Sequence, residues 1–308
     1  MAQLTMHDVI ARLEAGYSLA KAELSVIDLR SAPLAGGQFA DAYLRQANLA
    51  GAMCEGTDFS RATLTQANLT AVVLRDGILT GATLTQAHLE RADLRSLQAE
   101  DANFYGARLV QVDGVGANFS AIDGRNLHGA RSRFNQSQWM GAKCDGAVVS
   151  QGEFIGADLS RSHWNQATLD GANLSQSLLD DTQFEKAILA GANFTAAQGT
   201  GTQFQQADLT QAVLVEAQFE WGDFWNCRLV DTNLERASLY AATLESANLT
   251  NARLAGADLR DANLENAQLA GVDFSGAQVR GALFTDATGL TTEQRHWLQQ
   301  QGALNVAR

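Results

Sequence analysis

The sequence predicts an all-β solenoid, because one five-residue pattern runs through almost the whole chain. From Leu24 to Phe284, every fifth residue belongs to an unbroken series of 53 positions, with no insertion or deletion. These centre positions hold 29 Leu and all 13 Phe of the protein. Two residues earlier lies a small residue, Ala in 33 of the 53 cases, and a polar residue separates the two, as in Ala47-Asn48-Leu49.

The spacing of the pattern excludes a helix and a plain strand. A helix needs a period of 3.6 and a strand a period of two, whereas residues two apart point to the same side of an extended backbone. Each five-residue unit therefore has one inward pair and three outward residues. The chain must turn regularly and stack equivalent faces, which buries a continuous column of Leu and Phe.

The repeat resembles the pentapeptide-repeat family, whose consensus is A(D/N)LXX, over about 260 of the 308 residues. The resemblance implies a right-handed quadrilateral parallel β-helix with four five-residue faces per coil, so that side chains twenty residues apart stack. About thirteen coils would then extend over roughly 63 Å at the usual spacing of strands.

A solenoid needs covers at both ends, and each terminus supplies one. Thr5 caps a helix that ends at Gly16, and Thr291 with Gln294 reads as a capping box of a helix that ends at Gly302. The expected domains are a capping helix over residues 1–17, the β-helix over 18–289 and a second capping helix over 290–308. Trp297 has two interpretations: part of the cap core, which we favour, or a dimer contact at the C-terminal end, which the resemblance implies for some members.

The core pattern is weakest between residues 97 and 132. Small residues occupy several centre positions there, and a larger residue two positions earlier compensates, as in Ile122 with Gly124 and Leu127 with Gly129. Because glycine tolerates strained backbone, we expect this stretch to be the least regular part of the solenoid. A bulge or bend that serves as a docking kink is one interpretation, and tolerated drift of the sequence, which we favour, is the other.

Neither catalysis nor a cofactor or metal site is expected. Cys54 and Cys144 occupy centre positions and Cys227 a small inward position, so the thiols should be buried and inert. The five His are too scattered to share a metal. A formal charge of −12 argues against direct binding of nucleic acid. No apolar run is long enough for a membrane span, and the opening residues lack the apolar core of a signal peptide. A cytoplasmic location is therefore the expectation, with signal-independent export left open.

The outward residues predict a protein-binding patch and an acidic surface on one corner of the coils. The patch comprises Trp221, Trp225, Tyr240 and Glu220, since exposed Trp and Tyr dominate binding hot spots. Folding the numbering at twenty residues gathers acidic residues beside it: Asp145, Asp180, Asp181, Glu185, Glu245 and Glu265.

Two functions follow, and the sequence names no partner. The favoured one is a non-catalytic protein-protein interaction scaffold or adaptor, because a regular solenoid with one aromatic and acidic patch is suited to binding a protein. The opening residues resemble the start of pentapeptide proteins of bacterial secretion systems, which implies a component of such a system as one partner class. The alternative is a DNA mimic that binds a type II topoisomerase such as DNA gyrase, which the family resemblance implies. Residues 144–227 carry eleven acidic and two basic residues, or about one charge per 2.2 Å. Duplex DNA carries one per roughly 1.7 Å.

Overall fold

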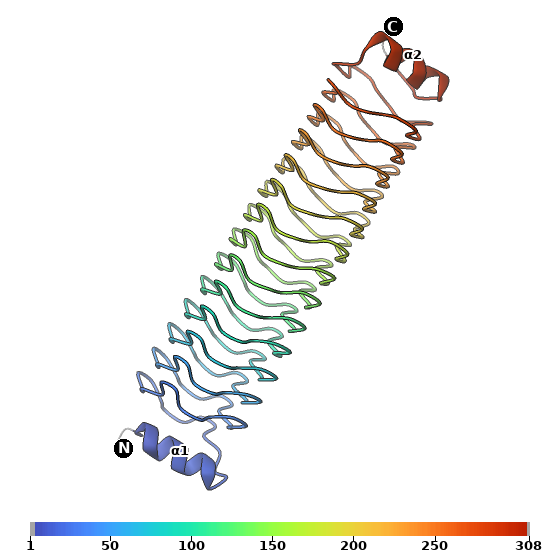
Figure 1. Cartoon of the computed structure of the whole chain (residues 1–308). Helices are drawn as coiled ribbons and strands as arrows, with labels where there is room; N and C mark the ends of the chain where they lie inside the picture. Colours follow the sequence, from blue (N-terminus) through green and yellow to red (C-terminus); the bar gives the residue numbers. More distant parts are fainter. Residues whose placement is uncertain (1–3, 307–308) are drawn as a thin grey trace. The chain divides into compact units, whose positions relative to one another are not determined.

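The computed structural model describes residues 4–306 and divides the chain into two compact units, Met1–Ala157 and Asp158–Arg308, called unit 1 and unit 2. Unit 1 begins with helix α1 (Met6–Glu14), and unit 2 ends with helix α2 (Thr292–Gln300). Every other element is a short extended segment joined by turns (Figure 1). Neither helix of the described chain has the length and apolar character needed to cross a membrane.

Each unit is a parallel β-helix with a coil of twenty residues. In unit 1, Glu23 bridges Tyr43 and Tyr43 bridges Thr63; in unit 2, Asp158 bridges Leu178 and Leu178 bridges Gln198. All these bridges are parallel, and bridging residues recur every five positions. Four faces therefore make one coil, which confirms the quadrilateral β-helix expected from the sequence. The handedness and the number of coils stay predictions.

The backbone hydrogen bonds explain why the unit has five residues. Tyr43 donates its N–H to Ala22 in the preceding coil (2.9 Å), and Leu44 donates to Thr63 in the following coil (2.8 Å). The turn closes when Ala47 donates to Leu44 (3.0 Å). Gln46, the second residue within that turn, has φ of 54° and donates to the next coil. A positive φ at this place is typical of a type II turn.

The polar residue before each centre position completes the turn. Its side-chain oxygen accepts a hydrogen bond from the backbone N–H two residues later, for which the backbone provides no acceptor. Asn48 Oδ1 accepts from Ala50 in this way (3.2 Å), and Asp58 Oδ1 accepts from Ser60 (2.8 Å). Asn and Asp are suited to this because their short side chains reach the backbone two residues on. The Asn/Asp preference of the repeat is therefore a turn signal.

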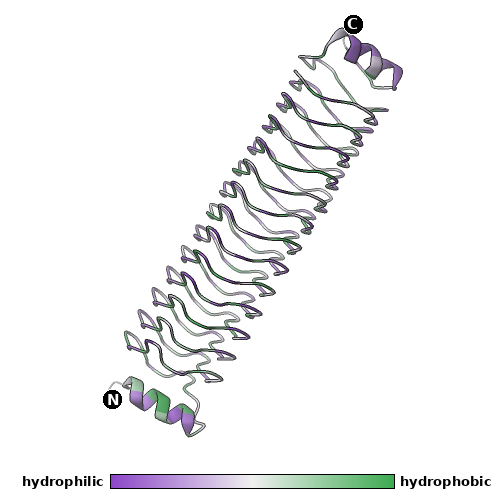
Figure 2. Cartoon of the chain, in the orientation of Figure 1, coloured by the Kyte–Doolittle hydropathy of each residue, from purple (hydrophilic) through white to green (hydrophobic). Residues whose placement is uncertain are grey.

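The core is the stacked column of centre residues, all of which are buried in each unit. Aromatic rings stack within it: Phe119 lies on Trp139 in unit 1 with ring centroids 4.5 Å apart, and Phe204 lies on Phe224 in unit 2 at 4.9 Å. Figure 2 shows hydrophobic and hydrophilic residues alternating along the coils. Such packing leaves no interior site for a ligand within a coil.

The expectation of an irregular stretch at residues 97–132 is wrong. The same turns, bridges and positive φ values continue through it without a break. Ile122 and Leu127 are buried, and a Cβ at Gly124 would lie 2.6 Å from Leu127 Cδ2. At Gly114, a Cβ would meet the ring of Phe134 from the next coil at 2.8 Å. Neighbouring side chains thus fill the volume that each glycine vacates, so the backbone has no reason to bend.

The predicted capping box of α2 is present, and the predicted N-cap Thr5 of α1 forms a capping box as well. Thr5 accepts from the backbone of Asp8 and Asp8 from that of Thr5; Thr291 and Gln294 do the same at α2. Val9 of α1 and Leu298 of α2 are buried, so each helix packs an apolar residue against its own unit. The domain boundaries at 17/18 and 289/290 stay predictions, and residues 1–3 and 307–308 lie outside the described residues.

Candidate protein-binding surface

Trp221 is the most exposed tryptophan of the described chain, with 62% of its surface accessible to solvent. It occupies the second turn position of its five-residue unit, with φ of 60°. Its backbone N–H donates to Tyr240 in the following coil (3.0 Å), so the turn itself is fixed. The regular turn therefore directs the indole outward, as the register predicted.

Tyr240 braces the indole from the following coil. The two rings meet edge to face, with centroids 5.8 Å apart and an interplanar angle of 90°. This geometry is favourable because the positive edge of one ring faces the negative face of the other. Glu220 lies next to Trp221 in the same turn and is partly exposed. Trp221, Tyr240 and Glu220 form what we call the Trp221 patch.

Arg260 holds Tyr240 in place. Its guanidinium carbon lies 5.6 Å from the centroid of the Tyr240 ring, within the range of a cation–π contact. Arg260 Nε in turn donates to Asp258 Oδ1 at 2.9 Å. The Arg260 side chain hydrogen-bonds to Asp258 and holds the pKa of that carboxyl below its usual range, so both groups stay charged. Four side chains thus form one chain of contacts from Asp258 to the exposed indole.

Trp225 lies apart from this chain of contacts. It occupies the next turn along the backbone and is 39% exposed. Its backbone N–H donates to Asp223 Oδ1 (2.9 Å). Among residues 4–306, the only ring that contacts Trp221 is Tyr240. The structure therefore brings together three of the four predicted patch residues and places the fourth across one face of the same coil.

Unit 1 contains a second copy of the brace without the tryptophan. Tyr105 is 39% exposed, and the Arg125 guanidinium lies 5.8 Å from its ring centroid. Arg125 Nε donates to Asp123 Oδ1 at 2.8 Å. The sequence offsets match those of Tyr240, Arg260 and Asp258, but Gln86 occupies the place that corresponds to Trp221. The Trp221 patch thus repeats the Tyr–Arg–Asp contacts of unit 1 and adds one exposed indole.

The sequence interpretation missed the arginine brace, although a signal for it was present. An Asp at the polar position followed two residues later by Arg recurs in the chain, and each such pair is hydrogen-bonded through Arg Nε. The pairs are Asp28–Arg30, Asp93–Arg95, Asp123–Arg125 and Asp258–Arg260. The position of Tyr twenty residues before the Arg would have identified the two cation–π contacts.

The predicted acidic surface is only partly assembled. In unit 2, Asp180 and Asp181 are exposed in one turn, and Asp180 Oδ1 accepts the N–H of Thr200 (2.8 Å). Glu185 pairs with Lys186 at 2.6 Å, which cancels its charge locally. Glu245 and Glu265 are partly exposed at equivalent positions of two coils. Asp145 belongs to unit 1 and is partly exposed there.

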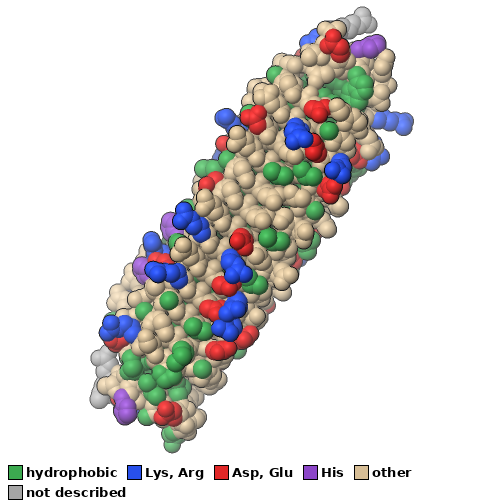
Figure 3. Space-filling model, in the orientation of Figure 1, with side chains coloured by type: hydrophobic (Ala, Val, Ile, Leu, Met, Phe, Trp, Pro, Cys, Tyr) green, Lys and Arg blue, Asp and Glu red, His purple; other side chains and the backbone are tan. Residues whose placement is uncertain are grey.

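Cation and anion side chains are interspersed on the face drawn in Figure 3, where Lys and Arg lie next to Asp and Glu. In unit 1, one ladder of ion pairs links the side chains of Arg75, Asp93, Arg95, Asp113 and Arg133. The visible face is therefore a mixed-charge surface.

The three thiols are buried, as expected from their positions. Burial raises the pKa of Cys54 to about 12 and moves those of Cys144 and Cys227 upward as well, so all three stay protonated near neutral pH. Within residues 4–306, no three His, Cys, Asp or Glu side chains gather as ligands for a metal ion.

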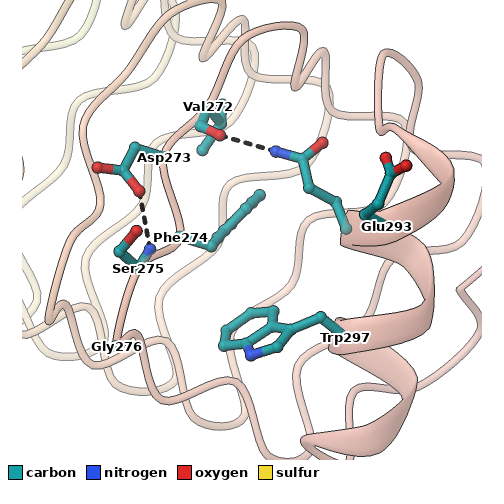
Figure 4. A pocket seen from close by; sticks show the side chains of 8 residues that line it. Val272, Asp273, Phe274, Ser275, Gly276, Glu293 and Trp297 are labelled. Atoms are coloured by element: carbon teal, nitrogen blue, oxygen red, sulfur yellow. Dashed lines mark hydrogen bonds between the residues drawn. The ribbon is translucent and has the colours of Figure 1, made fainter.

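Trp297 of α2 is half-buried against the last coil of unit 2. Its indole stacks on Phe274 with ring centroids 6.4 Å apart and an interplanar angle of 29° (Figure 4). This contact matches the first of its two predicted roles, as part of the cap core. Its predicted role as a dimer contact stays a prediction.

Comparison with known proteins places the chain in a family. The model for pentapeptide repeats matches more than half of the chain, in eight copies, over residues 38–76, 78–113, 153–181, 177–214, 212–251 and 247–286. The chain therefore belongs to the pentapeptide-repeat family, as the sequence pattern indicated. No curated protein is significantly similar to it.

Several solved structures are also similar to the chain. HetL, a pentapeptide repeat protein involved in heterocyst differentiation regulation from the cyanobacterium Nostoc sp. strain PCC 7120, is 22% identical, with a TM-score of 0.37 and coverage of 92% of this chain and 98% of HetL. A trypsin-treated form of QnrB1, a plasmid-mediated fluoroquinolone resistance protein, is 19% identical, with a TM-score of 0.43 and coverage of 57% and 95%. A pentapeptide repeat protein of the Arabidopsis thaliana thylakoid lumen is 28% identical, with a TM-score of 0.21 and coverage of 44% and 77%.

Proposed function

We propose that this protein is a non-catalytic scaffold that binds a protein partner through the Trp221 patch. The observation that carries the proposal is the exposed indole of Trp221, held edge to face by Tyr240. A component of a secretion system is the partner class favoured by the opening residues of the chain. A cytoplasmic location fits this role.

The geometry of the patch suits a binding anchor. A Trp that is 62% exposed presents a large apolar area to water, and burying such area against a partner is favourable by about 25 cal/mol per Å². Binding normally costs the entropy of ordering side chains. Here Tyr240 and Arg260 already restrict the indole, so less of that entropy is lost when a partner binds.

The non-catalytic part of the proposal is supported by the chemistry of the side chains. The thiols are protonated and enclosed, and the coils are filled by stacked Leu and Phe. A nucleophile needs an adjacent base and an open site for its substrate. The outward side chains instead make ion pairs and turn contacts, which hold a binding surface rigid.

The experiment is capture of partners from an extract of the native host, followed by measurement of affinity with each purified partner. Trp221→Ala should lower the affinity at least about tenfold. Tyr105→Ala is the matched control, since it removes a braced aromatic of unit 1 and should leave the affinity unchanged. Equal affinity of the parent and Trp221→Ala would contradict the patch as the binding site.

A second function, DNA mimicry toward a type II topoisomerase, is favoured by the clustering of acidic residues. Residues 144–227 carry eleven Asp and Glu against two bases, Arg161 and Lys186, which gives this segment a net charge of −9. Asp180 and Asp181 are exposed in adjacent turn positions. A supercoiling assay with purified DNA gyrase tests this: inhibition or protection by the parent supports mimicry, and no effect leaves the scaffold function.

A further inference from the structure

The last coil of unit 2 ends in an open β edge beside α2. In the coil before it, Leu254 donates its N–H to Asp273 and Gly256 donates to Ser275, both at 2.8 Å. The equivalent donors one coil later are the N–H groups of Phe274 and Gly276. Neither has an acceptor among the described residues. Two parallel donors of a β-helix are therefore left without a following strand.

The neighbouring face of the same coil shows how such an edge is closed. There the C-terminal segment of the chain adds itself as a strand: Gly281 donates to Gly302 and Phe284 to Leu304, both at 3.0 Å, and Leu304 donates back to Ala282 at 2.8 Å. An extended segment with one apolar residue thus completes one edge of this coil. The edge at Phe274 and Gly276 has the same donors and no such segment.

A pocket of about 290 Å³ lies directly over this open edge (Figure 4). Val272, Phe274 and the indole of Trp297 provide its apolar lining, and Gly276 leaves space because it has no side chain. Figure 4 shows the Phe274 ring pointing toward α2 and the indole pointing back toward the coil. One backbone carbonyl of this edge already has a hydrogen-bond partner, because Gln294 Nε2 of α2 donates to the Val272 carbonyl at 2.8 Å.

The charges at the pocket select one kind of occupant. Asp273 and Glu293 line it, and no Lys or Arg does so among the described residues. The backbone N–H of Ser275 donates to Asp273 Oδ1 at 2.9 Å, which keeps this carboxylate in place. A basic residue of an occupant would be attracted to these carboxylates.

We propose that this edge binds an extended peptide segment of a partner protein by strand addition. Two carbonyls of the segment accept the N–H groups of Phe274 and Gly276, in the way that Asp273 and Ser275 serve Leu254 and Gly256. The side chain between these carbonyls then lies over Phe274 and beside Trp297, where an apolar residue fits. A Lys or Arg immediately before this apolar residue stacks over Asp273, as Asp273 does over Arg253, at the pocket that Glu293 also lines. Strand addition of this kind takes its affinity from backbone hydrogen bonds and its specificity from the side-chain pocket.

The test uses the full chain and the peptide acetyl-Thr-Lys-Leu-Thr-Thr-amide, with amide hydrogen exchange followed by NMR. Saturating peptide should slow exchange at Phe274 and Gly276 at least about tenfold, because both amides gain acceptors. The amides of Gly281 and Phe284, already paired within the chain, are the internal reference and should not change. Absence of protection at about 1 mM peptide would overturn the proposal.

Three variants separate specific binding from an effect on the cap. Trp297→Ala should weaken peptide binding at least about tenfold, whereas His296→Ala, an exposed change in the same helix, should not. Reversal of the pocket charges by Asp273→Lys with Glu293→Lys should favour acetyl-Thr-Glu-Leu-Thr-Thr-amide over the Lys peptide. Equal binding of a peptide with Asp in place of Leu would contradict the apolar contact.

A second copy of the chain is the competing occupant. Protection of the Phe274 and Gly276 amides that rises with protein concentration, without peptide, would assign the edge to self-association and overturn the proposal. The Trp221 patch is independent of this site, so Trp221→Ala should leave peptide binding intact. Failure here would therefore leave the proposed scaffold function untouched.

Discussion

Pro33 and Met53 are parallel bridge partners on consecutive coils of unit 1, but only Met53 donates a backbone hydrogen bond to the coil before it. Met53 donates to Ala32 at 2.9 Å. Pro33 lies in the first coil, where the equivalent N–H would have no carbonyl to reach among the described residues. The single Pro of the protein is thus at a position that requires no donor, which is how Pro is tolerated at sheet edges.

Met53→Pro should therefore destabilise unit 1 by about 3 kcal/mol, because it removes a buried inter-coil hydrogen bond and inserts a ring between the strands. Pro33→Ala is the matched control and should change the stability by less than about 1 kcal/mol. Urea unfolding of both variants checks this. Similar midpoints for the two variants would show that the edge position of Pro33 is of no consequence.

Leu174→Asp should abolish the soluble folded protein or cost about 4 kcal/mol or more, because Leu174 is fully buried and no cation lies in the stacked column. Gln176→Asp, two residues later in an exposed turn, should stay within about 0.5 kcal/mol of the parent. Thermal denaturation compares the two. A stable Leu174→Asp variant would contradict the inward register at this position.

Asp93 should make the stability of unit 1 depend on pH in the acid range. The hydrogen bond from Arg95, with the charge of Arg75 nearby, lowers the pKa of Asp93 to about 2 from 3.8. A carboxyl with a lowered pKa in the folded chain stabilises the fold above its unfolded pKa and loses this effect as the pH falls through the folded value. The advantage of the parent over Asp93→Asn should thus be present above about pH 4, reach up to about 2 kcal/mol, and vanish near pH 2.

Thermal unfolding of parent and variant between about pH 2 and about pH 6 measures this difference. Asp101→Asn is the control, because Asp101 is exposed in a turn and makes no ion pair within the described chain. A stability difference between the parent and Asp93→Asn that does not change with pH would refute the electrostatic role of this carboxylate.

Trp225→Ala should weaken capture of the partner by more than about 2 kcal/mol and leave the fold intact, if the binding surface extends across the face that separates Trp225 from Trp221. The measurement is the affinity for the purified partner, alongside far-UV circular dichroism to confirm the fold. Unchanged affinity would confine the site to the Trp221 turn.

Reversal of Asp145, Asp180, Asp181 and Glu185 to Lys tests DNA mimicry. It changes the charge of residues 144–227 from −9 to −1. If the protein imitates DNA, gyrase binding and its salt dependence should collapse, because long-range attraction is screened beyond about 8 Å at physiological salt. A scaffold that relies on the Trp221 patch would lose mainly association rate. Binding at two salt concentrations distinguishes the cases, and no binding by the parent at either would end the mimicry hypothesis.

The candidate surface was predictable from the sequence only in part. The outward direction of Trp221 follows from its place in the five-residue unit, so its exposure could be predicted. Its contact with Tyr240 joins residues nineteen apart, and the brace by Arg260 joins residues twenty apart. These contacts depend on the side-chain conformations of separate coils, which the repeat does not specify. The prediction that placed Trp225 in the same cluster did not take into account that Trp225 lies in the next turn, so that one face of the coil separates the two indoles.

The sequence by itself determined the five-residue unit, the inward pair of each unit and the N-caps of both helices, because each depends on residues at most five apart. Alternation of the backbone makes the small residue and the centre residue share one side, and Asn or Asp closes the turn locally. Only the tertiary structure decided that residues 97–132 stay regular and that Phe274 and Gly276 lie at an open edge beside α2. Those outcomes depend on which atoms of neighbouring coils and of the cap fill the same space, and that is settled by packing between segments distant along the chain.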